Sequence, residues 1–528
     1  MAVTEARVRR RPEAGAAGIR SSRAAASRSD GSRRRLAARE TAVVLRLLEE
    51  RVARRDRLRD AARGSRNGGT RMGPTRPTPP RTPAVPLFAA VVRPLQAFLR
   101  LEAASGIVLL SCAVAALALA NSPLSDEYRA FFDTTLGVRV GPLAAEFSLA
   151  MLVNDGLMTI FFFVVGMEIK RELAVGELRT LRQALLPLVA ALGGMAVPAA
   201  IFLAFNAGTP AAAGWGVPMA TDIAFCVGVL TLLKARVPHA LVVFVTALAI
   251  FDDIGGILVI ALFYGHGLQL TWLAAAGGLT AALALMSRSY VRSLAAYALV
   301  TAALWYALHH GGIHATIAGV IAGLAIPARA RVSPRAVLRG VADHTAELLR
   351  AAEDEDLDSA AVLELEERIE DVESPLGRFV HALHPWVAFA IMPVFALANS
   401  GVDLRALEPA QLVGRLAVGT ALALFAGKLV GIFCCTWIAV RSGLAPMPGG
   451  ASAAKLIGVS AVAGIGFTVA LFIAGLAYGG GTQLLDEAKV GILAGSLVSG
   501  VVGALVLRLT PRVSSRSPAP ELSVASAS

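Results

Sequence analysis

The stretch that decides the fold is ALVVFVTALAIFDDIGGILVIALFY, residues 240–264. It carries no charge except two adjacent carboxylates, Asp252 and Asp253. At about 1.5 Å per residue, a helix of this length crosses the roughly 30 Å hydrocarbon core of a bilayer. An ionised Asp in the middle of such a helix costs about 3 kcal/mol, so a retained pair indicates a functional site.

Composition extends the membrane assignment to most of the chain. Of its 528 residues 55% are hydrophobic and 17% are charged, whereas a soluble protein carries about 25% charged residues. The net charge of +12 belongs to the N-terminus, because residues 1–85 hold 22 Arg against 8 acids. The cysteines lie in apolar runs, which argues against a disulfide or zinc framework, and we expect no cofactor. They are Cys112, Cys226, Cys434 and Cys435.

Residues 1–86 are rich in Arg, Ala, Gly and Pro and contain no apolar run long enough for a signal peptide or an anchor. We predict a basic, disordered cytoplasmic tail that touches anionic lipid, with one short amphipathic helix at 41–60. Nucleic-acid binding is the alternative for the Arg clusters, but we expect no nucleic-acid partner. Met72 is an alternative start of the protein.

The membrane domain is expected over residues 87–511, followed by a cytoplasmic tail at 512–528. Twelve apolar segments follow one another at short spacing, which predicts an all-α polytopic membrane protein of about twelve transmembrane helices. They lie near 103–121, 147–167, 183–205, 214–233, 240–264, 271–286, 293–309, 312–326, 383–399, 413–438, 454–478 and 489–509. Whether one helix or two run through His309–His314 stays open.

The loop charges predict the orientation. With the N-terminus inside, Lys- and Arg-rich connections such as KRELAVGELRTLRQ (170–183) fall on the inner side, and connections such as YGHGLQLT (264–271) have neither residue. The positive-inside rule then places both termini in the cytoplasm and requires an even number of spans.

One inner loop, 329–378, is much longer than the others. Its residues 343–373 hold 13 acids, and apolar residues at helical spacing predict a short amphipathic helix there. We expect a solvated acidic spacer; interaction with the basic tail or with a regulatory partner is the alternative.

Two apolar segments, one in each half of the chain, are interrupted by residues that break helices. Pro218 and several glycines interrupt 214–233, and Gly464 and Gly466 interrupt 454–478. Paired interruptions are typical of discontinuous helices whose open backbone lines an ion site. Close helix packing is the alternative role for each single glycine.

Few other charges lie inside the predicted spans. Asp222 follows the first interruption, Lys428 is the lone charge near the centre of its segment, and Asp155 lies early in the second span. Helix ends that meet at the interruptions leave partial charges, which a carboxylate such as Asp222 and a cation such as Lys428 would neutralise. A purely structural ion pair is the alternative for Lys428.

The paired acids point to a site that exchanges protons for a small cation. Burial and a neighbouring carboxylate both raise the proton affinity of an acid, and hard oxygen ligands suit cations such as Na+. Asp252 and Asp253 can hold either protons or the cation but not both, and that competition is sufficient for exchange. Thr221 would add a hydroxyl ligand, and Lys428 would pair with one Asp.

Three other classes of protein also bury acids in membrane helices. An intramembrane aspartyl protease should show a Gly-x-Gly-Asp motif, whereas the acids here stand in FDDIGG (251–256), and Lys428 would disrupt a dyad that shares one proton. A cation channel should show a repeated carbonyl filter motif, and this sequence contains none. A Na+ symporter is an alternative that the sequence does not exclude. We expect a transporter and not an enzyme.

Several motifs in this order and spacing resemble the NhaA family of bacterial sodium/proton antiporters, over about residues 98–511. They are ATDIAFCVGVL (220–230), ALAIFDDIGGILVIALFY (247–264), GIHATIAGVIAG (312–323), HPWVAFAIMPVFALANSGV (384–402), GKLVGI (427–432) and GIGFTVALFIAGLA (464–477). Discontinuous helices at the ion site are known in this family.

The resemblance implies an NhaA-like fold with two inverted three-helix repeats, near 183–264 and 413–509, whose middle helices are discontinuous and cross at the ion site. It implies that Asp252 and Asp253 carry the ion and the protons, that Pro218, Gly464 and Gly466 form the broken backbone, and that Asp222 and Lys428 compensate the helix ends. Lys428 would also pair with Asp252. Activity in the family is electrogenic, exchanging internal Na+ or Li+ for external H+.

Family members respond steeply to pH through a cytoplasmic cluster of charges. In this sequence the cluster falls on GMEIKREL, and two histidines at the inner end of the ninth span are expected within reach of it. Ordinary orientation-setting charges are the alternative. The residues are Glu168, Lys170, Arg171, Glu172, His381 and His384, with Val380 where relatives can carry an acid.

The family is often dimeric through a β-hairpin between the first two spans. TTLGVRVGPLAAEF (134–147) is short and alternating and contains a turn, so it is the expected hairpin. The expected partners are therefore Na+ or Li+, H+, the lipid bilayer and a second copy of the chain, in the bacterial cytoplasmic membrane.

Overall fold

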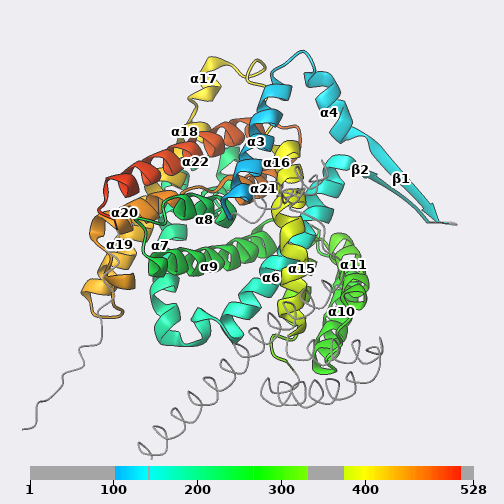
Figure 1. The fold of residues 1–528 in the computed structure, drawn as a ribbon. Coiled ribbons are helices and arrows are strands. Elements are labelled where there is room, and N and C mark those ends of the chain that lie inside the picture. Colours follow the sequence, from blue (N-terminus) through cyan, green and yellow to red (C-terminus); the bar gives the residue numbers. More distant parts are fainter. Residues whose placement is uncertain (1–101, 141–142, 266, 331–373, 513–528) are drawn as a thin grey trace, which may run out of the picture. The chain divides into compact units, whose positions relative to one another are not determined.

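The computed structural model describes residues 102–140, 143–265, 267–330 and 374–512 (Figure 1). The expected basic tail at 1–86, the amphipathic helices at 41–60 and 343–373, and nearly all of the C-terminal tail lie outside the described residues. The proposed domain limits therefore stay predictions.

Most of the described chain is helical. The first half contains α3 (Glu102–Ala120), α4 (Ser125–Asp133), α5 (Leu149–Met151), η1 (Leu152–Leu157), α6 (Met158–Ala174), η2 (Glu177–Arg179), α7 (Leu181–Asn206), η3 (Pro210–Gly214), η4 (Val217–Met219), α8 (Ile223–Leu232), α9 (His239–Phe263), α10 (Leu270–Arg288), α11 (Leu294–Gly311) and α12 (Ile317–Ala325). The second half contains α15 (Pro375–Trp386), η5 (Val387–Ile391), α16 (Met392–Asn399), α17 (Pro409–Leu412), α18 (Arg415–Leu422), η6 (Ala423–Gly427), α19 (Lys428–Arg441), η7 (Pro448–Gly450), α20 (Ala453–Val462), α21 (Phe467–Tyr478) and α22 (Gln483–Leu509).

The polytopic helical fold is confirmed. Among the described residues seven helices are long and apolar enough to cross a membrane, or ten if each of three bent helix pairs forms one span. The chain around His309–His314 forms two helices, α11 and α12, because Gly312 adopts a left-handed conformation (φ +80°) that ends α11. The exact number of twelve spans stays a prediction.

Each expected three-helix repeat has a broken middle helix. In the first repeat, α7 and α9 flank a helix that breaks between η4 and α8 with a bend of 42°. In the second, α18–α19 and α22 flank a helix that breaks between α20 and α21 with a bend of 45°. The two discontinuous helices are thus present where the glycines and Pro218 predicted them.

Glycines allow the first helices of the two repeats, α7 and α19, to pack backbone to backbone. A Cβ atom added at Gly431 would lie only 2.1 Å from the carbonyl oxygen of Gly193, and one added at Gly427 would lie 2.7 Å from Cα of Pro198. α6 and α12 meet in the same way, at Gly319 and Gly323. Close approach through small residues is how helices associate in lipid.

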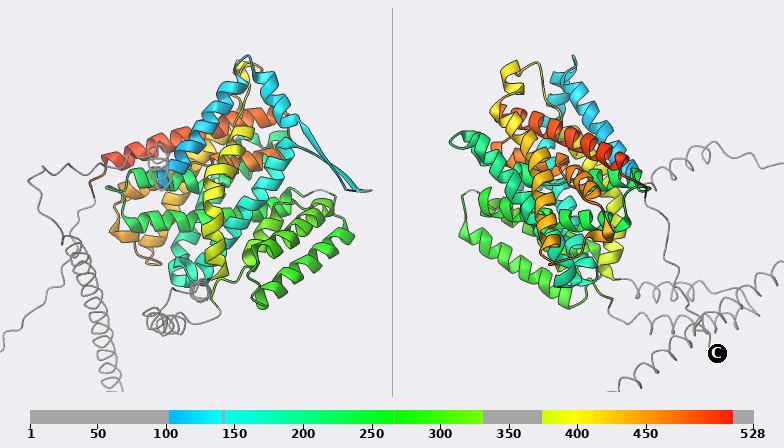
Figure 2. Two further views of the ribbon diagram at one scale, coloured as in Figure 1. Left: turned by 45° about the vertical axis from the view of Figure 1, so that its right-hand side comes forward. Right: turned by 90° about the vertical axis from the view of Figure 1, so that its left-hand side faces the viewer.

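A β-hairpin follows α4, as expected for residues 134–147. Strands β1 (Thr135–Val140) and β2 (Leu143–Ser148) pair antiparallel, with Thr135 opposite Ser148 and Val140 opposite Leu143. The hairpin projects beyond the surrounding helices (Figure 2).

Candidate ion-binding site

The two broken helices cross at their breaks and satisfy each other's backbone groups. The amide of Asp222 donates to the carbonyl of Ile465 at 2.7 Å. The Thr221 hydroxyl oxygen lies 3.0 Å from the carbonyl oxygen of Ala463, and the Cys226 thiol lies 3.1 Å from the carbonyl of Val462. The carbonyl end of α20 is therefore capped by residues of the first break. These carbonyl groups would otherwise need water as a hydrogen-bond partner, and water is absent from the hydrocarbon core.

One carboxylate serves the amino ends of both half-helices beyond the breaks. Asp222 is the N-cap of α8 and accepts from the amide of Phe225 at 3.1 Å. Its other oxygen accepts from the amide of Thr468 at 3.2 Å and from the Thr468 hydroxyl, in the first turn of α21. A negative charge is favourable at both places, because the amino end of a helix carries partial positive charge.

Asp252 and Lys428 form a fully buried ion pair. The ammonium nitrogen lies 2.6 Å from Oδ2 of Asp252, and the Thr221 hydroxyl donates to the same oxygen at 2.7 Å. Among the described residues Oδ1 of Asp252 has no hydrogen-bond partner. Lys428 begins α19 directly after the π-helix η6, a local irregularity that often marks functional positions.

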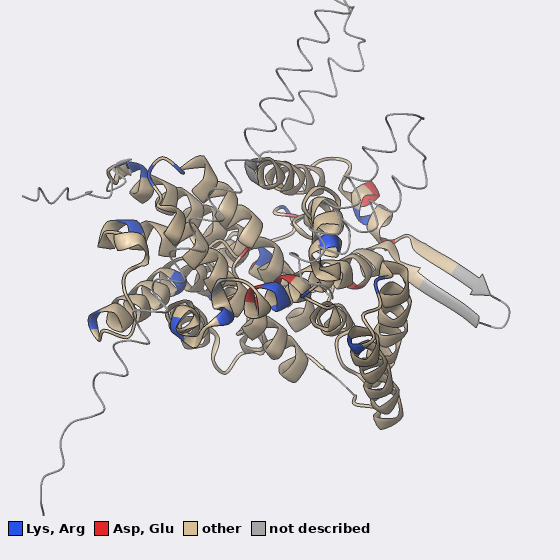
Figure 3. Ribbon diagram, turned by 60° about the horizontal axis from the view of Figure 1, so that its bottom comes forward, with Lys and Arg blue, Asp and Glu red and all other residues tan. Residues whose placement is uncertain are grey.

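Asp253 differs from Asp222 and Asp252 in its hydrogen bonding. It is 5% exposed, and within the described part of the chain it forms no hydrogen bond. It lines a cavity of about 480 Å³ together with Thr221, Asp222 and Thr468; this space is called the aspartate cavity below. Figure 3 shows acidic and basic segments near the middle of the helical core, with mostly uncharged ribbon around them.

The structure brings only part of the expected pH-response cluster to this site. Glu168 and His384 line the aspartate cavity. Lys170 instead donates to the carbonyl of Leu324 at 3.0 Å, and Glu172 lines a separate cavity of about 520 Å³. Two further members of the cluster are exposed and line neither cavity; these are Arg171 and His381.

The expected broken-backbone residues lie at the crossing. Pro218 is buried in η4, just before the first break. A Cβ atom at Gly464 would lie 2.6 Å from the carbonyl oxygen of Leu424, and one at Gly466 would lie 3.0 Å from that of Ala220. Both glycines leave space for neighbouring backbone, so their role here is close approach as well as helix breaking.

Sequence reasoning missed Thr468 and Cys226 as members of the site. The signal for Thr468 was present, because a hydroxyl residue follows directly after the second interruption, GIGF (464–467). Cys226 stood in an apolar run and gave no such signal.

The donor atoms suit a small cation. Two carboxylates and one hydroxyl are hard oxygen ligands, and no group of three or more His, Cys, Asp or Glu that could hold a metal ion occurs in the ranges the structure describes. Buried acids beside two crossing broken helices define a class, that of secondary ion transporters.

Comparison with known sequences gives the family. The profile of the family described as Na+/H+ antiporter 1 matches residues 96–507. The chain belongs to this family.

Named relatives agree with this result. The chain is 56% identical over 439 residues to the Na(+)/H(+) antiporter NhaA 1 of Myxococcus xanthus (strain DK1622), which covers 83% of this chain and 98% of the relative. It is 46% identical to the NhaA antiporter of Oleidesulfovibrio alaskensis, covering 80% and 95%, and 45% identical to that of Rhodopirellula baltica, covering 79% and 94%.

Proposed function

We propose that this protein exchanges Na+ for H+ across the membrane, with the two ions competing for Asp252 and Asp253. The observation that carries the proposal is the pair of adjacent carboxylate groups at the crossing, which both keep oxygen atoms available to a ligand. Among the residues that the structure describes, none is bonded to Oδ1 of Asp252, and Asp253 opens onto the aspartate cavity. The printed names of the relatives support Na+ and H+ as the substrates.

Lys428 and Thr221 set the state of the site when no cation is bound. The ammonium and the hydroxyl both occupy Oδ2 of Asp252. A cation that binds between the two acids competes with the ammonium for the carboxylate charge, and protons displace the cation by neutralising the acids. Asp222 stays fixed, because its two oxygens accept hydrogen bonds at two helix ends.

The finer features follow from the family and from the loop charges. The transporter expels Na+ or Li+ in exchange for external H+, is electrogenic, and lies in the bacterial cytoplasmic membrane with both termini inside. It dimerises through the β1–β2 hairpin. Glu168 and His384 couple pH to the site, because both share its cavity.

The activity is tested in everted membrane vesicles from a strain without other antiporters, with a dye that reports the pH gradient. Addition of Na+ or Li+ should dissipate the gradient, and K+ serves as the control. If neither Na+ nor Li+ dissipates the pH gradient at any pH from about 6.5 to 9, the protein does not exchange these ions for H+ and the proposal is wrong.

Asp253→Asn tests the site within the same assay. The substitution keeps the volume and removes the charge, so exchange should be abolished while the protein remains folded in the membrane. Normal turnover of this variant would place the ion elsewhere.

A further inference from the structure

The part of the first broken helix that precedes the break, residues 210–219, has little regular structure of its own. It consists of the short 3-10 helices η3 and η4, with a turn between them. Hydrogen bonds in such helices join residues three apart and have poorer geometry than those of an α-helix. The segment leads through Ala220 directly to Thr221. Its position therefore decides where the Thr221 hydroxyl lies.

Two tyrosine side chains hold this segment from neighbouring helices. The hydroxyl of Tyr478, the last residue of α21, donates to the carbonyl of Ala211 at 2.7 Å. The hydroxyl of Tyr264, directly after α9, donates to the carbonyl of Ala213 at 2.9 Å. The helix α9 also carries the adjacent acids of the ion site, and α21 follows the second break. The two hydroxyls thus tie residues 210–219 to both of these helices.

The sequence GWG, residues 214–216, leaves room for the two tyrosines. A Cβ atom added at Gly214 would overlap the hydroxyl of Tyr478, and one added at Gly216 would lie 3.2 Å from the hydroxyl of Tyr264. These glycines interrupt the apolar segment in the sequence. In the structure they also let the tyrosine hydroxyls approach the backbone closely.

We propose that Tyr264 and Tyr478 are positioning residues of the ion site, which fix residues 210–219 so that the Thr221 hydroxyl stays against Asp252. The proposal rests on the proposed function in taking Asp252 as an ion ligand. Neither tyrosine lines the aspartate cavity, so both act through the backbone of the segment. When one hydroxyl is lost, the Thr221 hydroxyl is in place for a smaller fraction of the time. The apparent affinity for the cation falls by the same fraction.

Tyr264→Phe and Tyr478→Phe test this role, because each removes a hydroxyl and keeps the packed ring. In everted vesicles, each should raise the Na+ concentration that gives half-maximal dissipation of the pH gradient about threefold, a size that the loss of one ordinary hydrogen bond allows. The maximal rate should stay nearly unchanged, because the acids themselves are intact. The double variant should need more Na+ than either single variant.

Tyr128→Phe is the matched control. The Tyr128 hydroxyl donates to the carbonyl of Leu397 at 2.6 Å, outside residues 210–219, so this variant loses the same kind of hydrogen bond. Thermal melting should show a similar loss of stability in all three single variants, whereas the Na+ requirement should rise only in Tyr264→Phe and Tyr478→Phe. An equal rise in Tyr128→Phe would reflect lower stability in general and would overturn the proposal.

Hydrogen exchange of the purified protein measures the segment without transport. Peptides that cover residues 209–221 should exchange their amide hydrogens faster in Tyr264→Phe and Tyr478→Phe than in the native protein or in Tyr128→Phe. Unchanged exchange in both variants overturns the proposal, and so does an unchanged Na+ requirement in both when the native protein transports. A native protein that does not exchange Na+ for H+ would instead remove the proposed function, and the ion-site role of the tyrosines with it.

Discussion

At the scale of single residues, the three acids at the crossing differ in what holds them. Asp222 accepts hydrogen bonds from Phe225 and Thr468 on both of its oxygens. Asp252 is held through one oxygen only, and Asp253 has no hydrogen-bond partner among the described residues. A carboxylate saturated by the protein is fixed in place, whereas an unsaturated one is available to an ion. This difference supports the proposed roles, in which Asp222 belongs to the scaffold and the adjacent pair carries the transported ions.

Thr468→Val tests the scaffold role of Asp222. The substitution keeps the shape and the backbone N–H but removes the hydroxyl donor, so it should lower the free energy of unfolding by about 1.5–3 kcal/mol, the range for hydrogen bonds to charged groups. It should also slow exchange. Thermal melting of the purified protein and the vesicle assay measure the two effects. Thr468→Ser retains the donor and should stay close to the native protein; equal losses in both variants would contradict the role of the hydroxyl.

Lys428→Ala tests the buried ion pair. Removal of one partner leaves the charge of Asp252 uncompensated, which costs about 3–5 kcal/mol, and transport should fall as well. The double variant Asp252→Asn, Lys428→Met carries no unpaired charge and should recover part of the stability. A melting curve unchanged by Lys428→Ala would argue against the pair.

The residues of this site were predictable from the sequence to different degrees. Asp252, Asp253 and Lys428 stood out because a charge in an apolar segment is costly. The partners of Asp222 did not, because Thr468 is 246 positions away and only the crossing brings the two together. Likewise, Glu168 and Glu172 looked equivalent in the sequence, but they line different cavities.

At the scale of elements, small residues decide how closely helices approach. α7 and α19 touch through Gly193 and Gly431, where a side chain would overlap backbone rather than a flexible group. Such an overlap cannot be relieved by a rotamer change, so the helices have to separate.

Gly431→Ala should therefore destabilise the protein by about 1–3 kcal/mol, the usual cost of overpacking. Thermal melting in detergent measures the loss. Gly475→Ala is the control, because a Cβ atom at Gly475 meets nothing within 4 Å. A Gly431→Ala variant as stable as the Gly475→Ala variant would mean that the two backbones do not approach as described.

Elements were predicted well where a pattern is local. Apolar runs of helical length and the alternating residues 134–147 indicated the helices and the hairpin directly. The separation of α11 from α12 depends on the backbone conformation of Gly312, and the π-helices η1, η5 and η6 leave no compositional signal. These features are decided by packing, which the sequence pattern does not contain.

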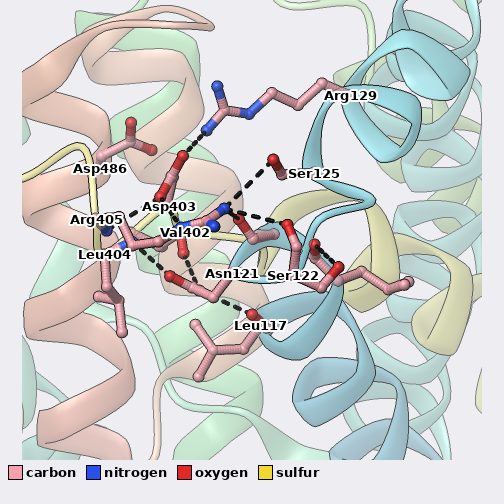
Figure 4. A network of polar contacts seen from close by, with 12 residues as sticks. Leu117, Asn121, Ser122, Ser125, Arg129, Val402, Asp403, Leu404, Arg405 and Asp486 are labelled. Carbon is pink, nitrogen blue, oxygen red and sulfur yellow. Dashed lines mark hydrogen bonds and ion pairs between the residues drawn. The ribbon is translucent and has the colours of Figure 1, made fainter.

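At the scale of the whole described core, a polar network joins the first spans to the second half of the chain (Figure 4). Asn121, at the end of α3, donates to the carbonyl of Val402 at 2.7 Å and accepts from the amide of Leu404 at 2.9 Å. Arg129 of α4 binds Asp403 at 2.9 Å. The network thus fixes the loop 400–408 against α3 and α4, beside a cavity of about 770 Å³ that Asp403 helps to line.

Asp403 makes this network sensitive to acid. Burial alone would raise the pKa of Asp403, but the amide of Arg405 and the charges of Arg405 and Arg129 outweigh it, and the pKa lies below the ordinary value of 3.8. A lowered pKa in the folded state means stability that is present above pH 3.8 and is lost as the pH falls through the folded-state pKa. Melting temperatures should drop more steeply with acid in the native protein than in Asp403→Asn. If the melting temperatures of the two proteins fall in parallel as the pH is lowered, Asp403 is not the source of the acid sensitivity.

The reciprocal capping at the crossing has a mechanical consequence. Residues 221–226 hold the carbonyl end of α20 and the amino end of α21 at the same time, so pulling the two breaks apart would strip several buried groups of their partners far from water. Such a loss is costly, because polar groups without partners are not compensated in lipid. We therefore expect the two interrupted helices to move together as one rigid unit during transport, with the movement occurring between this unit and the helices around it.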